Sequence, residues 1–145
     1  MPESPLLFDV NALVALSLTT HQHHRPAHRF LAGHQGRWAT CPTTESALVR
    51  LLLNPAVTGS ARRPQDVLAI LGGMRNDPRW ELLADSSSLA EPVVDLTILS
   101  GHQQVTDVHL VNLAALGGFL LATFDAAIPT WLAPKDRRHV CVIPT

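Results

Sequence analysis

The chain has 145 residues, of which 46% are hydrophobic and 16% charged, and its formal net charge is −1. This length and apolar content suit one domain with its own core, so we expect a single domain over residues 1–145. A net charge so close to zero excludes a general basic field for nucleic acid, and any such contact must come from a local patch. Lys135 is the only lysine, and arginine, which supplies the other cations, suits bidentate phosphate contacts.

The cysteine content and the lack of long apolar stretches bear on where in the cell the protein is expected. Cys41 and Cys141 fall in predicted strands and are too few for a disulfide framework, so we expect reduced core residues. The opening MPESPLLFDVN lacks the basic and apolar regions of a secretory leader. No stretch approaches the roughly 18 apolar residues of a membrane span. We therefore expect a soluble, cytoplasmic protein with no membrane partner.

Strands and helices alternate along the chain. Short apolar runs indicate buried strands, and helical periodicity indicates helices. In chain order the patterns predict a strand over residues 6–10, helices over 12–18 and 24–32, a strand over 37–41, a helix over 44–53, a surface loop over 56–64, a helix over 65–74, a strand over 80–84, helices over 93–100 and 107–116, a strand over 119–124, a short helix over 126–132 and a strand over 140–143. This alternation predicts a three-layer α/β/α sandwich around a mostly parallel sheet.

Four carboxylates lie where the chain leaves a predicted strand or enters a predicted helix. Asp9 and Asp125 directly follow apolar strands. Glu45 and Asp107 lie in the first turns of helices, and any one of the four could simply cap or stabilise a helix. In an open parallel sheet, however, ligands bind at the carboxyl ends of the strands, so these acids are expected to meet. Such an oxygen-only cluster needs a counter-charge, for which Mg²⁺ or Mn²⁺ is suited.

Two neutral residues accompany the acids. Thr123 precedes Asp125 by two positions and shares its strand face, so its hydroxyl is expected beside that carboxylate. Asn11 follows Asp9 by two. Asn112 lies five residues into the helix of the third acid, on a different face, and is left outside the site.

Other chemistries are less well supported. Four histidines lie within residues 21–28, and His24 and His28 have the spacing of a zinc-binding helix pair. No nearby acid or cysteine completes that shell, so we expect this cluster, including His21 and His23, to be solvent-exposed. A haloacid dehalogenase-type phosphatase would need an acid where Asn11 stands, and no P-loop sequence occurs.

The four acids with their flanking residues resemble the PIN-domain ribonucleases, particularly the VapC-type toxins of bacterial toxin–antitoxin pairs. The similarity covers nearly the whole chain. It rests on Asp-x-Asn after the first strand (DVN), a helix-opening glutamate after a Pro-Thr turn (CPTTES), a helix start with T-D (QVTD) and a strand ending in T-x-D (TFD).

This resemblance implies a single flavodoxin-like PIN domain and a Mg²⁺-dependent endoribonuclease that hydrolyses RNA with metal-activated water. The implied catalytic set is Asp9, Asn11, Glu45, Asp107, Thr123 and Asp125, with the four acids as metal ligands. It also implies an RNA substrate such as tRNA or rRNA, a cognate VapB-like antitoxin that blocks the site, and a homodimer. Two alternatives stay open: a PIN-like nuclease in RNA processing outside a toxin system, and a non-catalytic scaffold that binds a partner.

Contacts to RNA are less well defined by the sequence. Five arginines could bind phosphates, although each taken alone fits a solvated surface residue better. The candidates are Arg50, Arg62, Arg63, Arg137 and Arg138.

Overall fold

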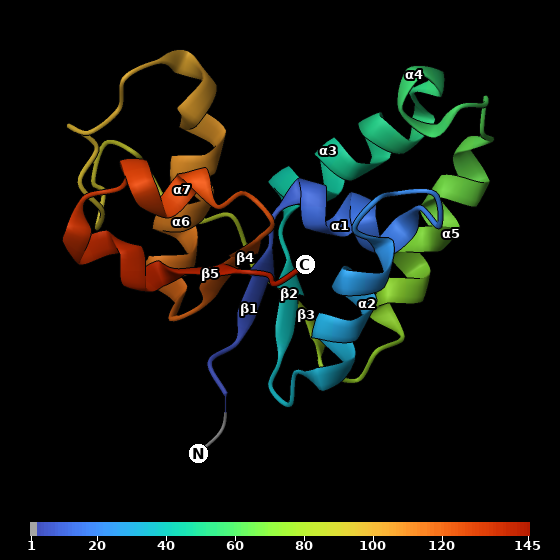
Figure 1. The fold of residues 1–145 in the computed structure, drawn as a ribbon, viewed down its shortest axis with the longest axis horizontal. Coiled ribbons are helices and arrows are strands. Elements are labelled where there is room, and N and C mark those ends of the chain that lie inside the picture. Colours follow the sequence, from blue (N-terminus) through green and yellow to red (C-terminus); the bar gives the residue numbers. More distant parts are fainter. Residues whose placement is uncertain (1–2) are drawn as a thin grey trace.

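The computed structural model describes residues 3–145 and places five strands in one sheet among helices (Figure 1). The strands run over Leu6–Phe8 (β1), Trp38–Thr40 (β2), Trp80–Leu82 (β3), Leu120–Thr123 (β4) and Val140–Val142 (β5). The helices run over Val10–Ser17 (α1), His24–Gly33 (α2), Pro42–Leu53 (α3), Pro55–Thr58 (α4), Pro64–Arg75 (α5), Val105–Gly117 (α6) and Ala127–Trp131 (α7), with 3₁₀ helices over His102–Gln104 (η1) and Pro134–His139 (η2). Over residues 3–145, no helix combines the length and apolarity needed to cross a membrane.

The sheet is entirely parallel, with the strand order β3-β2-β1-β4-β5. Leu6 pairs with Trp38 of β2 on one side and with Leu120 of β4 on the other. The chain therefore builds outward from β1 to β3 and then restarts on the opposite side at β4. The boundary between β1 and β4 is the point at which the winding direction reverses, and such reversal points are where open α/β sheets bind ligands.

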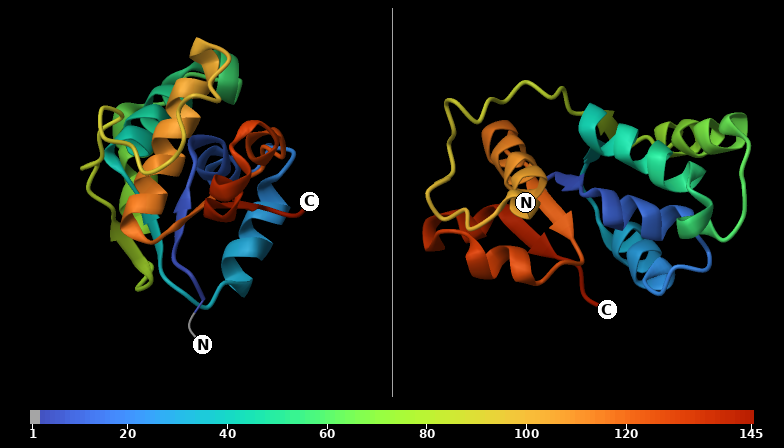
Figure 2. Two further views of the ribbon diagram at one scale, coloured as in Figure 1. Left: turned by 90° about the vertical axis from the view of Figure 1, so that its left-hand side faces the viewer. Right: turned by 90° about the horizontal axis from the view of Figure 1, so that it is seen from above.

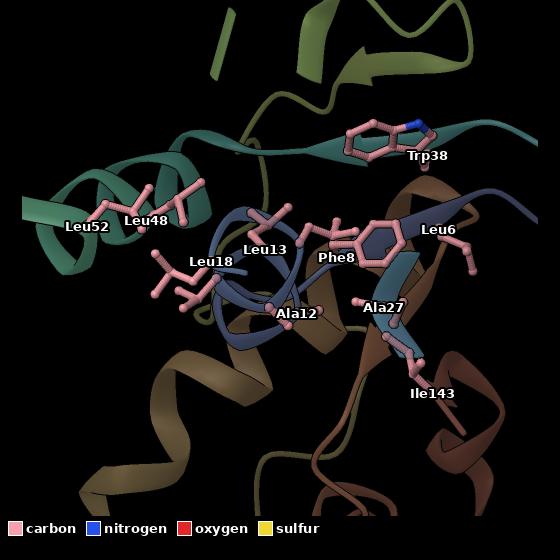
Figure 3. Close-up of a cluster of buried hydrophobic side chains, with 14 of the residues drawn as sticks. Leu6, Phe8, Ala12, Leu13, Leu18, Ala27, Trp38, Leu48, Leu52 and Ile143 are labelled. Carbon is pink, nitrogen blue, oxygen red and sulfur yellow. The ribbon is translucent and has the colours of Figure 1, made fainter. Parts of the chain in front are cut away.

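Each face of the sheet carries its own hydrophobic core, because successive strand residues point to opposite faces. Leu6, Phe8 and Trp38 pack against the side formed by α1, α2, α3 and α5 (Figure 3). Leu7 and Leu121 pack on the other side with residues of α6 and α7. Figure 2 shows these helices on either side of the sheet. Burying one large apolar side chain contributes roughly 1.5–3 kcal/mol, so both layers help to fix the sheet. The predicted three-layer sandwich is confirmed.

The predicted helix over residues 93–100 is wrong, because this segment forms turns between β3 and α6 (Figure 2). The amide oxygen of Asn112 on α6 accepts hydrogen bonds from the backbone N–H groups of Val93 and Val94, at 2.8 and 3.3 Å. A distant side chain thus satisfies donors at the start of the segment and holds it against α6. Asn112 is buried in this role, outside the acidic site.

Smaller differences from the predictions lie at element ends. α1 begins at Val10, two residues early, because Asp9 caps it. The predicted loop over 56–64 begins inside a short helix, Pro55–Thr58. Cys41 is the N-cap of α3 rather than a strand residue, whereas Cys141 does lie in β5 but is only half-buried. Both thiols are free.

Candidate acidic site at the carboxyl edge of the sheet

The acidic site lies at the carboxyl edge, by which we mean the side of the sheet where the parallel strands end. Asp9 directly follows β1, and Asp125 comes two residues after the neighbouring strand β4. Asp107 lies in the first turn of α6. A small cavity of about 40 Å³ is lined by Asp9, Asn11, Thr43 and Asp107 among others. Three of the four predicted acids therefore come together where β1 meets β4.

Asp9 is the central and most buried of these acids, with only 4% of its surface exposed. Its Oδ1 accepts a hydrogen bond of 2.8 Å from the backbone N–H of Ala12, and its Oδ2 accepts one from the hydroxyl of Thr123. Burial raises the pKa of Asp9 to about 6, against the lowering effect of these two bonds. The nearby carboxylates of Asp107 and Asp125 raise this pKa further. Asp9 can therefore exchange a proton close to neutral pH.

Thr123 belongs to the site, but its hydroxyl has a different partner from the predicted one. It donates to Asp9 on the neighbouring element, not to the side chain of Asp125. Its oxygen accepts a 3.0 Å hydrogen bond from the backbone N–H of Asp125. Thr123 therefore connects the acids that follow β1 and β4.

Asp107 and Asp125 surround Asp9 with further negative charge. Burial, followed by repulsion from Asp125, raises the pKa of Asp107. Asp125 is exposed, and its Oδ1 accepts a 2.9 Å hydrogen bond from the N–H of Ala127 at the start of α7. No lysine or arginine lines the hollows around these acids, within the residues that the structure describes. The site holds negative charge without a local cation to balance it.

Glu45 lies at the same edge but is directed elsewhere. Its Oε2 accepts a 2.5 Å hydrogen bond from the hydroxyl of Thr40, the last residue of β2. Thr40 in turn accepts a 3.0 Å hydrogen bond from the indole N–H of Trp80 on β3. Glu45 contributes neither to the pKa shift of Asp9 nor to that of Asp107. The fourth predicted acid is therefore held against β2, beside the other three.

The acids match the chemistry of Mg²⁺ better than they match its geometry. Across residues 3–145, no three Asp, Glu, His or Cys side chains stand at metal-ligand spacing. The acids nevertheless offer the oxygen donors that Mg²⁺ prefers, and the charge of Asp125 raises the pKa of both Asp9 and Asp107. The residues therefore fit a hard divalent cation in chemistry. To share one ion, their carboxylates would have to move closer together than they stand in this structure.

The five arginines predicted to bind RNA are spread over three parts of the fold. Arg50 lies on α3, Arg62 and Arg63 precede α5, and Arg137 and Arg138 lie on η2. Arg63 pairs with Asp66 at 3.1 Å. None of the five lines either hollow beside the acids. The structure does not gather them into one patch, and their contact with RNA stays a prediction.

The histidine cluster forms no zinc site within the described part of the chain. The rings of His24 and His28 hydrogen-bond to the carbonyls of Ala15 and Leu16, at 2.8 Å each, in the last turn of α1. The expectation that the cluster is solvent-exposed is only partly right, because His24 is half-buried and His28 exposed. These two rings satisfy carbonyls that a helix end leaves without partners.

One acidic group beside the site was missed. Asp85, shortly after β3, accepts a 2.5 Å hydrogen bond from the hydroxyl of Thr43, which lines the small cavity. Its other oxygen lies 2.8 Å from Nε2 of His109 on α6. Asp85 follows a predicted strand as Asp9 and Asp125 do, so the same positional argument could have found it.

An all-parallel sheet in an α/β/α sandwich, with acids where its winding reverses, places the protein in the class of PIN-like domains. Sequence comparison then defines the family. No family model matches the sequence. Ribonuclease VapC38 of Mycobacterium tuberculosis is 43% identical to this chain, over 92% of the chain and 94% of the relative. Ribonuclease VapC39 of the same organism is 37% identical, over 84% and 89%. Ribonuclease VapC44 is 32% identical, over 94% and 98%. The chain belongs to the VapC family of PIN-domain toxins, as the sequence motifs predicted.

Proposed function

We propose that this protein is a divalent-metal-dependent endoribonuclease and acts as the toxin of a toxin–antitoxin pair. The observation that carries the proposal is the group of Asp9, Asp107 and Asp125, whose charges oppose one another at the boundary of β1 and β4. Similarity to proteins named ribonuclease supports the choice of RNA as substrate.

In this proposal the three aspartates would hold the cation, and Glu45, whose carboxylate bonds Thr40 in this structure, would be the fourth ligand. When bound, Mg²⁺ or Mn²⁺ polarises a phosphoryl oxygen and lowers the pKa of a coordinated water. Thr123 orients the Asp9 carboxylate by its hydrogen bond. Asp9 releases its proton before it can act as a ligand, since the ionised carboxylate is the metal-binding form. In-line attack of water on the phosphorus would break the bond to the 3′-oxygen, which takes up a proton, and so would leave 5′-phosphate and 3′-hydroxyl ends.

The test is cleavage of tRNA and rRNA by the purified protein with Mg²⁺, with EDTA, and with Asp9→Asn in place of the parent. Asparagine retains an oxygen for the N–H of Ala12, so the cap of α1 survives the change. We expect cleavage with Mg²⁺ that EDTA abolishes and Asp9→Asn removes. Glu91→Gln, which changes an exposed carboxylate away from the site, is the matched control and should cleave like the parent. An Asp9→Asn protein as active as the parent would contradict the assignment of Asp9 to the catalytic site. A parent protein that cleaves no RNA with Mg²⁺ would favour the non-catalytic scaffold.

A VapB-like antitoxin is the proposed partner, and a homodimer the proposed state of the toxin. Apolar side chains on α4 and α5 are available to a partner helix, since Val57 is 40% and Leu68 56% exposed. Co-expression with the cognate VapB-like antitoxin should yield a complex that no longer cleaves RNA. Light scattering of the toxin alone measures its own oligomeric state.

A further inference from the structure

We propose a nucleobase subsite beside the acids, formed by His21, Gln22, His23 and Phe124. It rests on the proposed RNA cleavage and extends it, because the subsite would hold a base of the RNA strand next to the scissile phosphate. None of the five arginines predicted to contact phosphates lines this subsite.

The subsite is an open hollow of about 380 Å³. Its lining residues are Asn11, His21, Gln22, His23, Phe124 and Asp125. Asn11 also lines the small cavity with Asp9 and Asp107, so the two spaces share a wall. A phosphate placed on the acids therefore has this hollow as its immediate neighbour.

Two aromatic rings give the hollow a flat, rigid surface. His23 stacks on Phe124 with ring centroids 4.7 Å apart and an angle of 19° between the planes. Phe124 directly follows β4, so the sheet fixes one side of the stack. His21 lies beside it, with its ring 5.8 Å from that of His23. Proteins bind unpaired RNA bases largely by stacking them on such rings.

Hydrogen bonding fixes the orientation of the histidine loop. The backbone N–H of His23 donates to Nδ1 of His21 at 3.0 Å, so a neutral His21 ring carries its proton on Nε2. The Nε2–H group of His21 is then available as a donor to a ligand. His24 and His28 hold the following turn against the end of α1 through the carbonyls of Ala15 and Leu16. The loop is thus ordered by its own contacts.

The charges in the hollow favour a base over a second phosphate. Among the residues described, no lysine or arginine lines it, and its one formally charged side chain is the carboxylate of Asp125. A phosphate would be repelled there, whereas a flat, neutral group that stacks and hydrogen-bonds would not. Gln22, which is exposed in this loop, offers both a donor and an acceptor to the edge of a base.

The experiment is an NMR titration of the protein in EDTA, in which the ring signals of His21 and His23 are followed. The ligands are AMP, GMP, CMP and UMP, with ribose 5-phosphate as the probe that lacks a base. We expect one or more nucleotides to shift both rings and ribose 5-phosphate to leave them unchanged. His23→Ala should weaken that binding at least five-fold, the lower end of what one base–ring stack contributes. His23→Phe, which keeps a ring, should restore most of it, and Gln35→Ala, at the opposite edge of the sheet, should change nothing.

A second readout uses cleavage of short RNAs with each base beside the cut. His23→Ala should raise KM with little change in kcat and reduce the preference for one base. Equal shifts by ribose 5-phosphate and the nucleotides would overturn the subsite, because the hollow would then bind phosphate. So would a protein that cleaves RNA while no nucleotide shifts either ring. If nucleotides shift the rings but no RNA is cleaved, the proposed catalysis fails and the base-binding hollow stands.

Discussion

Asp9 has two roles that compete at the level of one side chain. As the N-cap of α1 it stabilises the helix by accepting the N–H of Ala12, and as the buried member of the acidic group it must carry charge. Burial above all, with smaller contributions from the charges of Asp107 and Asp125, raises the pKa of Asp9 to about 6, so the folded protein retains this proton to about that pH. Capping α1 requires only an acceptor for the N–H of Ala12, so the two further acids near Asp9 point to a second role for its carboxylate.

The stability of the metal-free protein should therefore fall as the pH rises through the range in which Asp9 ionises. The folded pKa of Asp9, about 6, lies above its ordinary value of 3.8. Between these values the unfolded chain releases the proton and the folded one keeps it, so the contribution of Asp9 to stability declines by ~3 kcal/mol in total and is constant above the range. Urea unfolding in EDTA from pH 3.5 to 8 measures this slope. Asp9→Asn should lack it and Glu91→Gln should retain it; equal slopes in all three proteins would contradict the assignment.

Removing the hydroxyl of Thr123 should raise the pKa of Asp9 further, because its hydrogen bond favours the ionised carboxylate. Thr123→Val preserves the shape of the side chain but leaves a buried carboxylate oxygen without its donor, at a cost of about 1–3 kcal/mol. We expect the acidic limb of the pH–rate profile for RNA cleavage to move to higher pH. Thr123→Ser should return it toward the parent, and an unmoved profile in Thr123→Val would show that the hydroxyl does not tune Asp9.

The sequence predicts where a side chain lies when its position at the end of a strand alone determines which edge of the sheet it reaches. Asp9 and Asp125 follow apolar strands, which was enough to bring them to one edge. The partner of Thr123 was not predictable, because it depends on which strand lies next to β4. Alternation along one strand predicts that Thr123 lies beside Asp125. The pairing of Phe8 with Ala122 instead brings Thr123 next to Asp9.

At the level of elements, Asp85 connects three parts of the carboxyl edge. It follows β3 and bonds both Thr43 on α3 and His109 on α6. Between β3 and the 3₁₀ helix η1, residues 83–101 form no helix or strand that could hold this segment. The bonds of Asp85 therefore anchor this segment where it starts to cross the sheet edge.

Asp85→Ala should loosen that segment and leave the sheet intact. Loss of the two side-chain bonds should lower the free energy of unfolding by about 1–3 kcal/mol. Hydrogen exchange should accelerate first in residues 83–101, ahead of β1 and β4. Ser86→Ala, an exposed neighbour, is the control. Unchanged exchange in this segment would mean that its packing, rather than Asp85, holds it.

The elements that were predicted correctly are those whose own sequence determines them. β1 is a fully buried apolar run and β4 is buried except at Leu120, which is the pattern typical of central strands in a parallel sheet. The segment over 93–100 has helical spacing, yet its backbone donors at Val93 and Val94 bond to Asn112, far along the chain. Such competition comes from tertiary packing, which a local pattern cannot reveal.

For the whole molecule, the acidic group exists only when the sheet is complete. Asp9 belongs to the part of the chain that builds β1 to β3, and Asp107 and Asp125 to the part that builds β4 and β5. Their mutual repulsion therefore opposes folding of the entire domain. A cation that the three share would reverse this opposition and stabilise the fold.

Binding of Mg²⁺ should accordingly stabilise the protein in a pH-dependent way. Above the pKa of Asp9, about 6, the carboxylate is free to bind, whereas at pH 5 a proton must leave first. A free cation concentration one hundred times the Kd raises the free energy of unfolding by about 2.7 kcal/mol. We expect Mg²⁺ to raise the Tm at pH 8, EDTA to reverse the rise, and little effect at pH 5. Asp9→Asn should respond weakly at both pH values, since it lacks the ionising ligand. A rise in Tm that is as large at pH 5 as at pH 8 would mean that the cation binds elsewhere on the molecule.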